Sequence, residues 1–358
     1  MSALIKAVID TGALRANLGA VRARARGSKV MAVVKANAYG HGLVMTAVGL
    51  AGADAFGVAR LEEGIQLREA GITQSIVLLE GVFSHEQLLE AAIHRFGIVV
   101  HDPLQIALLE AFTGSYRFTV WLKVDTGMNR LGFRPEDATA AMARLGALRT
   151  PLEELRLLTH LGRADEQDSD ATPEQLRRFA ALSAGRPFAT SIGNSAGIFG
   201  WPDAAGDWVR PGLALYGVSP LPGASGESLG LKPVMRLETT VIGLRRVPMG
   251  EQVGYAGAWT AHRDSRIAIL AGGYGDGLLR SLGDGSPVLI GGKRVPLAGR
   301  VSMDMIAVDV TDLPEVHLGT RCVLWGPGLP VEEVAAAAGT ISYEMLCGVR
   351  QRVAHEVI

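Results

Sequence analysis

The chain has 358 residues, 48% of them hydrophobic and 20% charged, so it can bury a large core and disorder is not expected. Its 35 basic and 36 acidic residues nearly cancel, which gives no reason to expect nucleic acid as a partner. The two cysteines, Cys322 and Cys347, are too few for a disulfide framework or a cysteine-rich zinc site. We therefore expect a reduced, cytoplasmic setting.

The N-terminus shows no feature of an export or membrane signal. Residues 1–10 lack the charged and apolar regions of a signal peptide, and no apolar run reaches membrane-spanning length.

A strand-like run at residues 5–9 precedes the first predicted helix, which Thr11 can cap and which extends from Ala13 to about Arg24. A chain of this length is natural for two domains.

Strand-like and helix-like segments alternate after the first helix. The predicted strands are residues 30–34, 55–58, 76–79, 97–100, 118–124, 155–159, 188–191 and 208–209. The predicted helices between them are residues 61–70, 85–92, 104–112, 135–145 and 173–182. Eight alternating strands fit a (β/α)8 barrel, expected over residues 10–222. A doubly wound open sheet is the alternative, but no G-x-G-x-x-G string follows the first strand.

The pattern changes near Pro220, where residues 221–230 are rich in Pro, Gly and Ser and indicate a linker. Beyond it, short β-like runs recur at residues 238–244, 266–271, 287–290, 294–297, 305–310 and 321–325. The Gly291-Gly292 pair between two of these runs is a hairpin signal, and one late helix is expected at residues 331–338. We expect a mostly β C-terminal domain over residues 223–358, together with an N-terminal strand within residues 1–9.

The string VVKANAYGHG, residues 33–42, places a lysine at the end of the first predicted barrel strand. There Lys35 carries a flexible amine into a cleft, where desolvation and neighbouring cations can lower its pKa and make it a nucleophile or a base. For a lone lysine, the plainer interpretation is a side chain that reaches solvent.

Four more chemically capable strings follow predicted strands five to eight. They are Arg130 within DTGMNRLGF, His160, Asn194-Ser195, and Arg210-Pro211-Gly212. The active site of a (β/α)8 barrel lies at the carboxyl ends of its strands, so these groups and Lys35 should converge on one rim. The loops that hold Ser195 and Gly212 are those that usually build the phosphate site of such barrels. Each group also has a structural alternative, such as a helix cap for Asn194, a core histidine for His160 or an ion-pair partner for Arg210.

Three strings in the C-terminal half place polar groups where plain turns do not need them. They are GYA at residues 254–256, GGYGDG at residues 272–277 and GRVSMDM at residues 299–305. Glycine-rich hairpins with ordinary tyrosines are the alternative interpretation.

Taken together, these strings resemble those of alanine racemases, the fold-type-III class of pyridoxal-phosphate enzymes, in the family order from Val33 to Glu344. The resemblance implies pyridoxal 5′-phosphate as cofactor, no metal, and a homodimer whose active sites are shared between subunits. It implies interconversion of L-alanine and D-alanine, which supplies D-alanine for peptidoglycan. The protein would supply orientation and the cofactor would supply carbanion stabilisation.

The resemblance also implies roles for the catalytic residues. Lys35 would bind the cofactor covalently and serve as one base, and Tyr255 would reach in from the partner subunit as the other. Arg210 would face the pyridine nitrogen, and His160 would pack at the cofactor face and link Arg210 to the second base. Arg130 would assist the substrate carboxylate and the phenolic oxygen of the cofactor.

The remaining implied roles concern binding. The cofactor, and mainly its phosphate, would be held by Tyr39, Asn194, Ser195, the amides of Gly212 and Leu213, and Tyr343. Lys123 matches a lysine that is often carbamylated and that orients Arg130, and the Met303 amide would meet the substrate carboxylate. The substrate entryway would consist of Asp165, Tyr274, Arg280, Arg300 and Ile341.

The sequence departs from the family pattern at three places. Gly254 stands where Ser usually precedes the second-base tyrosine, Gly275 stands where Ala is commoner, and Ser195 lacks the usual upstream histidine. A serine or broad-specificity racemase on the same scaffold is the main alternative, because an apolar pocket discriminates weakly against one hydroxyl. A decarboxylase of basic amino acids would need a catalytic cysteine, and neither cysteine lies in such a motif. A non-catalytic cofactor carrier would have no reason to keep Tyr255.

Overall fold

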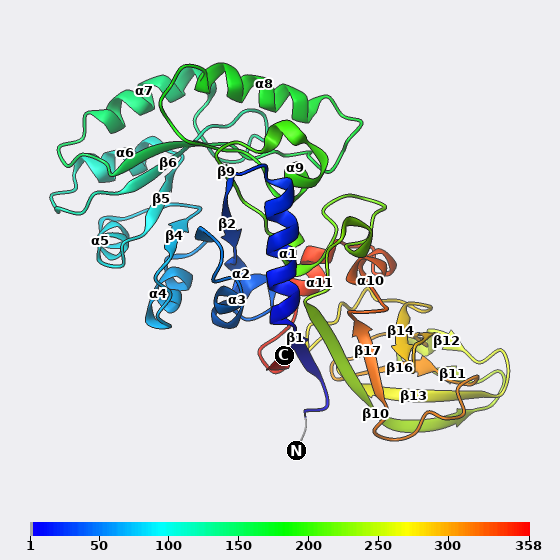
Figure 1. The fold of residues 1–358 in the computed structure, drawn as a ribbon. Coiled ribbons are helices and arrows are strands. Elements are labelled where there is room, and N and C mark those ends of the chain that lie inside the picture. The colour runs from blue at the N-terminus through cyan, green and yellow to red at the C-terminus, as the bar shows by residue number, and fades with distance from the viewer. Residues whose placement is uncertain (1–2) are drawn as a thin grey trace.

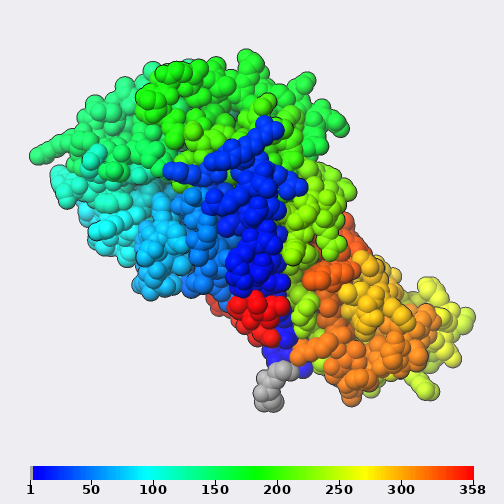
Figure 2. Space-filling model, in the orientation of Figure 1, coloured from blue at the N-terminus to red at the C-terminus, as the bar shows by residue number. Residues whose placement is uncertain are grey.

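The computed structural model describes residues 3–358 and shows a helix-wrapped barrel beside a smaller β domain (Figure 1). In the space-filling view of Figure 2, the β domain protrudes from one side of the barrel. No helix within residues 3–358 has the length and apolar character needed to cross a bilayer.

The barrel is built from eight parallel strands in the order β8-β7-β6-β5-β4-β3-β2-β9. These are β2 (Lys29–Val33), β3 (Ala55–Val58), β4 (Ser75–Leu78), β5 (Gly97–Val100), β6 (Thr119–Lys123), β7 (Glu154–Leu158), β8 (Thr190–Ser191) and β9 (Trp208–Val209). A bridge between Ser191 and Gly206 joins β8 to the segment before β9 and closes the ring. The predicted (β/α)8 barrel is therefore confirmed, and the open sheet is excluded.

Helices cover the outside of the barrel, as Figure 1 shows. They are α1 (Thr11–Arg24), α3 (Leu43–Gly49), α4 (Leu61–Glu69), α5 (His85–Ile93), α6 (Pro103–Glu110), α7 (Pro135–Gly146), α8 (Ala171–Ser183) and α9 (Ser195–Gly200). The short element α2 (Lys35–Tyr39) follows β2 and is a turn with positive φ values. Short 3-10 turns follow at η1 (Pro202–Ala204), η2 (Leu213–Tyr216) and η3 (Glu227–Leu229). Glu332 accepts hydrogen bonds from the Ser219 and Gly226 amides at 3.0 and 2.9 Å, so the predicted linker is tied to the C-terminal helices.

Alternation along the barrel strands decides which side chains reach the mouth. The barrel interior is filled by the buried cluster Met31, Ala55, Val77, Val99, Trp121, Leu158 and Trp208. Because successive strand residues point to opposite faces, the residues two positions later also face inward. On four strands these mouth residues are polar, namely His101, Lys123, His160 and Arg210. Beneath them the Arg156 guanidinium lies 4.6 and 4.7 Å from the Trp121 and Trp208 rings, so the barrel is packed and forms no pore.

The second domain is mostly β, as predicted. Its main sheet contains β1 (Lys6–Ile9), β10 (Met235–Val247), β13 (Ser265–Ala271), β14 (Pro287–Ile290), β15 (Lys293–Pro296), β16 (Met305–Asp309), β17 (Arg321–Trp325) and β18 (Ala354–Val357). A separate ribbon pairs β11 (Gln252–Val253) with β12 (Trp259–Thr260), and the turn η4 (Tyr255–Gly257) lies between them. Two helices complete the domain, α10 (Val331–Ala337) and α11 (Ser342–Cys347).

The N-terminal strand belongs to this sheet. It pairs antiparallel with β10 and parallel with β18. Sequence reasoning missed β18 because its four residues, AHEV, contain only two apolar side chains, which do not alternate. Met1 and Ser2, part of the predicted strand region, lie outside the described residues. The Gly291-Gly292 hairpin is confirmed, since both glycines have positive φ values (56° and 79°) between β14 and β15.

The N-cap of α1 differs from the prediction. Asp10 is the cap, and its Oδ1 accepts a hydrogen bond from the Ala13 amide at 2.8 Å. Thr11 is the first helical residue, and its hydroxyl donates to the Ile358 carbonyl at 3.0 Å. Either side chain could cap a helix from sequence alone, and the choice depends on the backbone of the preceding strand.

Removing the Asp10 cap is expected to weaken the fold. Asp10→Ala leaves an amide of the first turn of α1 without its acceptor and should lower the free energy of unfolding by about 1 kcal/mol. Urea unfolding followed by circular dichroism measures this change. Asp10→Asn keeps an oxygen acceptor and serves as the control. Equal losses in both variants would contradict the capping role.

Candidate active site

Lys35 is followed directly by a left-handed turn. Ala36, Asn37, Ala38 and Tyr39 have φ values of 54°, 53°, 53° and 52°, and none of them is glycine. The left-handed conformation costs roughly 1–2 kcal/mol for each such residue, so the surrounding structure must hold this turn. The sequence predicted a turn here but not its hand, because three of its four residues are alanine or tyrosine, which rarely adopt positive φ.

The turn places Tyr39 inside an aromatic cluster. The Tyr39 ring stacks on Tyr216 with centroids 4.7 Å apart, and it lies 5.7 Å from the Tyr343 ring. The Tyr216 hydroxyl donates to the Val33 carbonyl at 2.9 Å, which links the cluster to the end of β2. Burial, and then the nearby Tyr343, raise the pKa of Tyr39 above its ordinary value, so its hydroxyl remains a hydrogen-bond donor.

Tyr343 reaches the barrel mouth from the other domain. Helix α11 packs so closely on the turn that a Cβ on Gly40 would lie 2.1 Å from the Leu346 carbonyl oxygen. Cys347 follows Tyr343 by one helical turn, and electrostatic interactions link its thiol to Lys35 and Tyr39. Sequence reasoning left Cys347 outside the site, because nothing in its local sequence reveals this packing.

The loops after β8 and β9 form a cradle of amides. Ser195 Oγ accepts hydrogen bonds from the Gly212 amide at 3.0 Å and the Ala214 amide at 3.2 Å. A Cβ on Gly212 would lie 2.4 Å from the Tyr39 hydroxyl oxygen, so this position requires glycine. Leu213 begins η2 in the same loop. Asn194 caps α9 by accepting from the Gly197 amide at 2.8 Å, which is the structural role considered for it.

Arg210 is buried among neutral acceptors. Its guanidinium donates to Ser191 Oγ and the Thr159 carbonyl, both at 2.6 Å, and to the Ile192 carbonyl at 3.2 Å. Burial lowers the pKa of Arg210 to about 10, which leaves it charged at neutral pH. Arg210 is buried and makes no ion pair within residues 3–358, so the predicted surface ion-pair alternative is wrong. A buried cation without a carboxylate is costly unless a ligand compensates it.

His160 adjoins Arg210. A guanidinium nitrogen of Arg210 lies 3.3 Å from His160 Nδ1 and can only donate, so Nδ1 is the acceptor and the ring proton lies on Nε2. Burial, and then the cations Arg210 and Lys123, lower the pKa of His160 well below its ordinary value. The imidazole is therefore neutral at physiological pH.

Lys123 lies beside the same cations. It is 8% exposed, and burial followed by Arg210 and Arg130 lowers its pKa from 10.5 to about 8. Arg130 itself is exposed, in a loop that Asp125 organises by accepting from the Gly127 and Asn129 amides, both at 3.0 Å. The mouth thus concentrates positive charge, which favours an anionic ligand.

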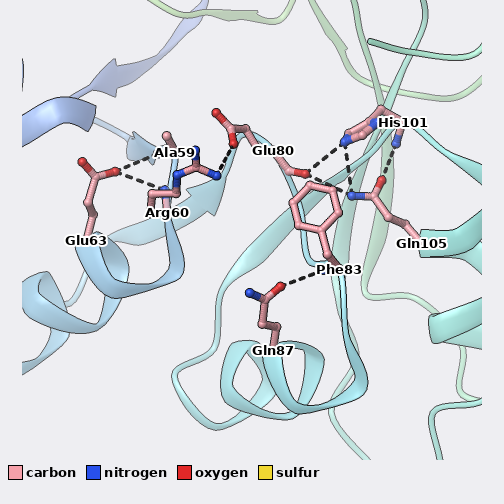
Figure 3. A network of polar contacts seen from close by, with 8 residues as sticks. All are labelled: Ala59, Arg60, Glu63, Glu80, Phe83, Gln87, His101 and Gln105. Carbon is pink, nitrogen blue, oxygen red and sulfur yellow. Dashed lines mark hydrogen bonds and ion pairs between the residues drawn. The ribbon is translucent and has the colours of Figure 1, made fainter.

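A second polar network lines the mouth at the ends of β3, β4 and β5 (Figure 3). Arg60 pairs with the Glu80 carboxylate at 2.8 Å, and His101 Nε2 lies 3.1 Å from the Glu80 carbonyl oxygen. Gln105 holds the His101 amide at 2.7 Å. Sequence reasoning missed these residues, although the position of His101 directly after a predicted strand was a usable signal.

The residues implied for the second base and the substrate carboxylate lie on the β domain. Tyr255 is 68% exposed, and with Arg300 it lines a hollow of about 420 Å³. Met303 is also exposed. The ribbon of β11 and β12 that carries Tyr255 lies far from α2 in Figure 1. Within residues 3–358, no hydrogen bond, ion pair or ring contact joins these three side chains to the barrel mouth.

The implied entryway residues are likewise spread over both domains. Asp165 is exposed in the loop after β7, and its charge acts on the Tyr343 hydroxyl. Ile341 is the N-cap residue of α11 and is 62% exposed. Tyr274 and Arg280 are exposed on the β domain. One chain therefore brings Lys35 together with its cofactor-side candidates but leaves Tyr255, Met303 and Arg300 apart.

The depressed pKa of Lys123 can be measured directly. Because the folded-state pKa is lowered, the amine should lose its proton near pH 8, well below the ordinary lysine value of 10.5. Reductive ¹³C-methylation followed by an NMR pH titration in CO₂-free buffer reports this midpoint, and Lys123→Arg assigns the signal. Arg130→Gln removes a neighbouring cation and should move the midpoint upward. A midpoint near 10.5 in the otherwise unchanged protein would contradict the burial of this amine beside Arg210 and Arg130.

Known proteins are similar to this chain in sequence along nearly its whole length. The family model described as alanine racemase, N-terminal domain, matches residues 9–220, and the one for the C-terminal domain matches residues 234–357. Alanine racemases of Shewanella baltica (strain OS185) and Pectobacterium carotovorum subsp. carotovorum (strain PC1) are 46% and 47% identical, over 99% and 98% of both chains.

Solved structures show the same fold. A biosynthetic alanine racemase from Pseudomonas aeruginosa has a TM-score of 0.96 and 42% identity, with 100% of both chains covered. The alanine racemase from Bartonella henselae, solved with covalently bound pyridoxal phosphate, has a TM-score of 0.90 and 31% identity, again with both chains fully covered. By sequence and by fold along its whole length, this chain belongs to the alanine racemase family.

Proposed function

We propose that this chain is a pyridoxal-phosphate-dependent isomerase that interconverts L-alanine and D-alanine and supplies D-alanine for peptidoglycan. Lys35 and Tyr255 of the partner subunit are its two bases. The observation that carries the proposal is the barrel mouth itself. It combines a lysine immediately before a strained turn, a cradle of amides and a buried arginine that makes no ion pair within residues 3–358.

The residues of the mouth fit the cofactor. The Gly212 and Leu213 amides lie in the loop that Ser195 Oγ contacts and are donors that a phosphate can use, and Tyr39 and Tyr343 add hydroxyl groups beside them. The absence of a side chain at Gly212 leaves the Tyr39 hydroxyl room at the cradle. Asn194 and Leu213 shape the same two loops. When bound, pyridoxal phosphate supplies the electron sink that stabilises negative charge on the substrate Cα.

Arg210 and His160 tune the environment of the cofactor ring. Arg210 is held by four acceptors from surrounding strands and loops, so its charge has a fixed place. Beside the pyridine nitrogen, an always-charged guanidinium opposes protonation of that nitrogen and so limits side reactions such as transamination. His160 is neutral and accepts from Arg210, so its Nε2–H can link Arg210 onward toward the second base.

Lys123 and Arg130 orient the substrate carboxylate in this proposal. A lysine with a pKa of about 8 has a substantial neutral fraction near neutral pH, and a neutral amine can react with CO₂ to form a carbamate. The cations Arg210, Arg130 and Lys35 surround this amine and would stabilise the resulting negative charge. A carbamate on Lys123 would then pair with Arg130 and hold it toward the substrate.

Racemisation requires proton removal from one face of Cα and proton return on the other. Lys35, attached to the barrel rim, can address one face only. Tyr255 is exposed in the turn η4 between β11 and β12, and this ribbon lies far from α2 in Figure 1, which supports the use of Tyr255 by a partner subunit. In the homodimer we propose, Tyr255 and the Met303 amide of one chain complete the barrel mouth of the other. The entryway would then combine Asp165 and Ile341 of one chain with Tyr274, Arg280 and Arg300 of its partner.

Substrate choice is the direct test of the proposed function. The purified protein, supplied with pyridoxal phosphate and a panel of L-amino acids, should form the D-enantiomer from L-alanine with the highest kcat/KM. Chiral chromatography measures the products, and Lys35→Ala is the inactive control. A higher kcat/KM for L-serine would favour the broad-specificity alternative, and no D-product from any substrate would contradict the proposal.

The site of cofactor attachment can be tested separately. Borohydride reduction should fix the cofactor on the peptide that contains Lys35 and abolish its near-violet absorbance. Peptide mass spectrometry locates the modification. Its appearance on Lys6, Lys29 or Lys232 in place of Lys35 would contradict the assignment.

A further inference from the structure

Two side chains that no proposed reaction step uses contact the backbone of the left-handed turn. Glu63, from α4, reaches the beginning of the turn, and His41 reaches its end. The turn carries Lys35 immediately before it and Tyr39 as its last residue. Any group that holds this turn therefore controls two side chains of the candidate site at once.

The Glu63 carboxylate accepts hydrogen bonds from three backbone amides. Its Oε1 accepts from the Ala36 amide at 2.6 Å, and its Oε2 accepts from the Ala59 and Arg60 amides at 2.9 and 3.1 Å. Figure 3 shows its second oxygen directed at the loop that follows β3. Hydrogen bonds to an ionised carboxylate are stronger than neutral ones. Glu63 thus ties the residue after Lys35 to the end of the neighbouring barrel strand.

His41 holds the other end of the turn. Its Nδ1 lies 2.9 Å from the Tyr39 carbonyl oxygen and 3.1 Å from that of Ala38, so Nδ1 must carry the proton and donate. The ring is fully buried, lies 4.5 Å from Tyr216, and has no hydrogen-bond partner at Nε2 among the described residues. Burial lowers the pKa of His41 to about 4, so the ring is neutral.

We propose that Glu63 and His41 are positioning residues that hold the strained turn, and through it Lys35 and Tyr39, in the geometry that the cofactor requires. This inference rests on the proposed function, in which Lys35 and Tyr39 bind pyridoxal phosphate. Neither residue touches a reacting atom. Loss of either should let the left-handed residues relax toward ordinary backbone angles, because the strain then lacks its restraint.

Glu63→Gln tests the first restraint. An amide has one oxygen and one NH₂ group, so in either orientation it presents a donor to at least one amide that now donates to Glu63. Glu62→Gln is the matched control, because Glu62 is the exposed neighbour on the same helix. Hydrogen–deuterium exchange of the peptide spanning residues 34–43 and the dissociation constant of pyridoxal phosphate are measured for both full-length variants.

Glu63→Gln and Glu62→Gln are expected to differ in hydrogen exchange and in cofactor affinity. Exchange within residues 34–43 should become at least about tenfold faster in Glu63→Gln, and cofactor binding about tenfold weaker, as the loss of charge-assisted hydrogen bonds implies. Glu62→Gln should match the unchanged protein in both. The cofactor-dependent rise in melting temperature should shrink in Glu63→Gln alone. A general structural defect would instead lower the melting temperatures of the cofactor-free and loaded forms equally.

Two replacements of His41 distinguish a residue that holds the turn from one that only fills space, because the two roles predict opposite orders of cofactor affinity. His41→Asn keeps an N–H group near the position of Nδ1, whereas His41→Gln places its amide near Nε2, where the native ring has no partner. If His41 holds the turn, Asn should preserve cofactor affinity better than Gln. If His41 only fills space, Gln should be the better replacement, because its volume is closer to that of histidine.

Two outcomes would overturn the inference: exchange and cofactor affinity of Glu63→Gln equal to those of Glu62→Gln, or a higher cofactor affinity for His41→Gln than for His41→Asn. The exchange measurement is also made on the cofactor-free full chain. It reports on the turn whether or not Lys35 binds the cofactor, so a failure of the proposed function is recognised separately by the absence of cofactor on Lys35.

Discussion

The left-handed turn after β2 is the constraint on which the site depends. Parallel strands can deliver a side chain to the barrel mouth, but the direction of Lys35 and the place of Tyr39 are decided by four residues with positive φ. Such a segment persists only where its surroundings over-determine it. Here the aromatic stack on Tyr216, the packing of α11 on Gly40 and the hydrogen bonds of Glu63 and His41 do so together.

Charge is the second organising feature. Strand alternation places Lys123, His160 and Arg210 in one inward-facing layer, and Arg130 and Lys35 lie close enough to act on the pKa values of Lys123 and His160. Without an anion, this arrangement is unfavourable, since burial and then neighbouring cations lower the pKa of Lys123, and Arg210 is buried without an ion pair within residues 3–358. A phosphorylated cofactor, a substrate carboxylate and a carbamate would each relieve that repulsion. The mouth is therefore organised for ligands more than for the stability of the barrel.

Much of this architecture could be predicted from the sequence, because it depends on local periodicity. The eight barrel strands, the hairpin at Gly291-Gly292 and the rim positions of Lys35, His160 and Arg210 follow from apolar runs and their ends. The N-terminal strand was also predicted, but its parallel partner β18, hundreds of residues away in the chain, was missed. The cap at Asp10, the hand of the turn at Lys35 and the contact of Cys347 with the site depend on tertiary packing that no short window of sequence contains.

The site residues implied by the family resemblance fall into two groups, one on the barrel and one on the β domain. Those on the barrel, such as Ser195 and Arg210, meet in one chain, as the rule for strand ends predicts. Tyr255 does not join them within one chain, so the role proposed for it requires a contact between two chains. The proposed active site is therefore shared, with one incomplete half from each subunit.

Complementation between two inactive variants tests that claim most directly. Lys35→Ala and Tyr255→Phe homodimers should each be nearly inactive, and they should be unfolded and refolded together at equal concentrations. In a mixed two-fold dimer, one site would keep both bases and the other would keep neither, so roughly a quarter of all sites should recover alanine racemisation. No recovered activity in dimers shown by mass spectrometry to be mixed would contradict a site shared between subunits.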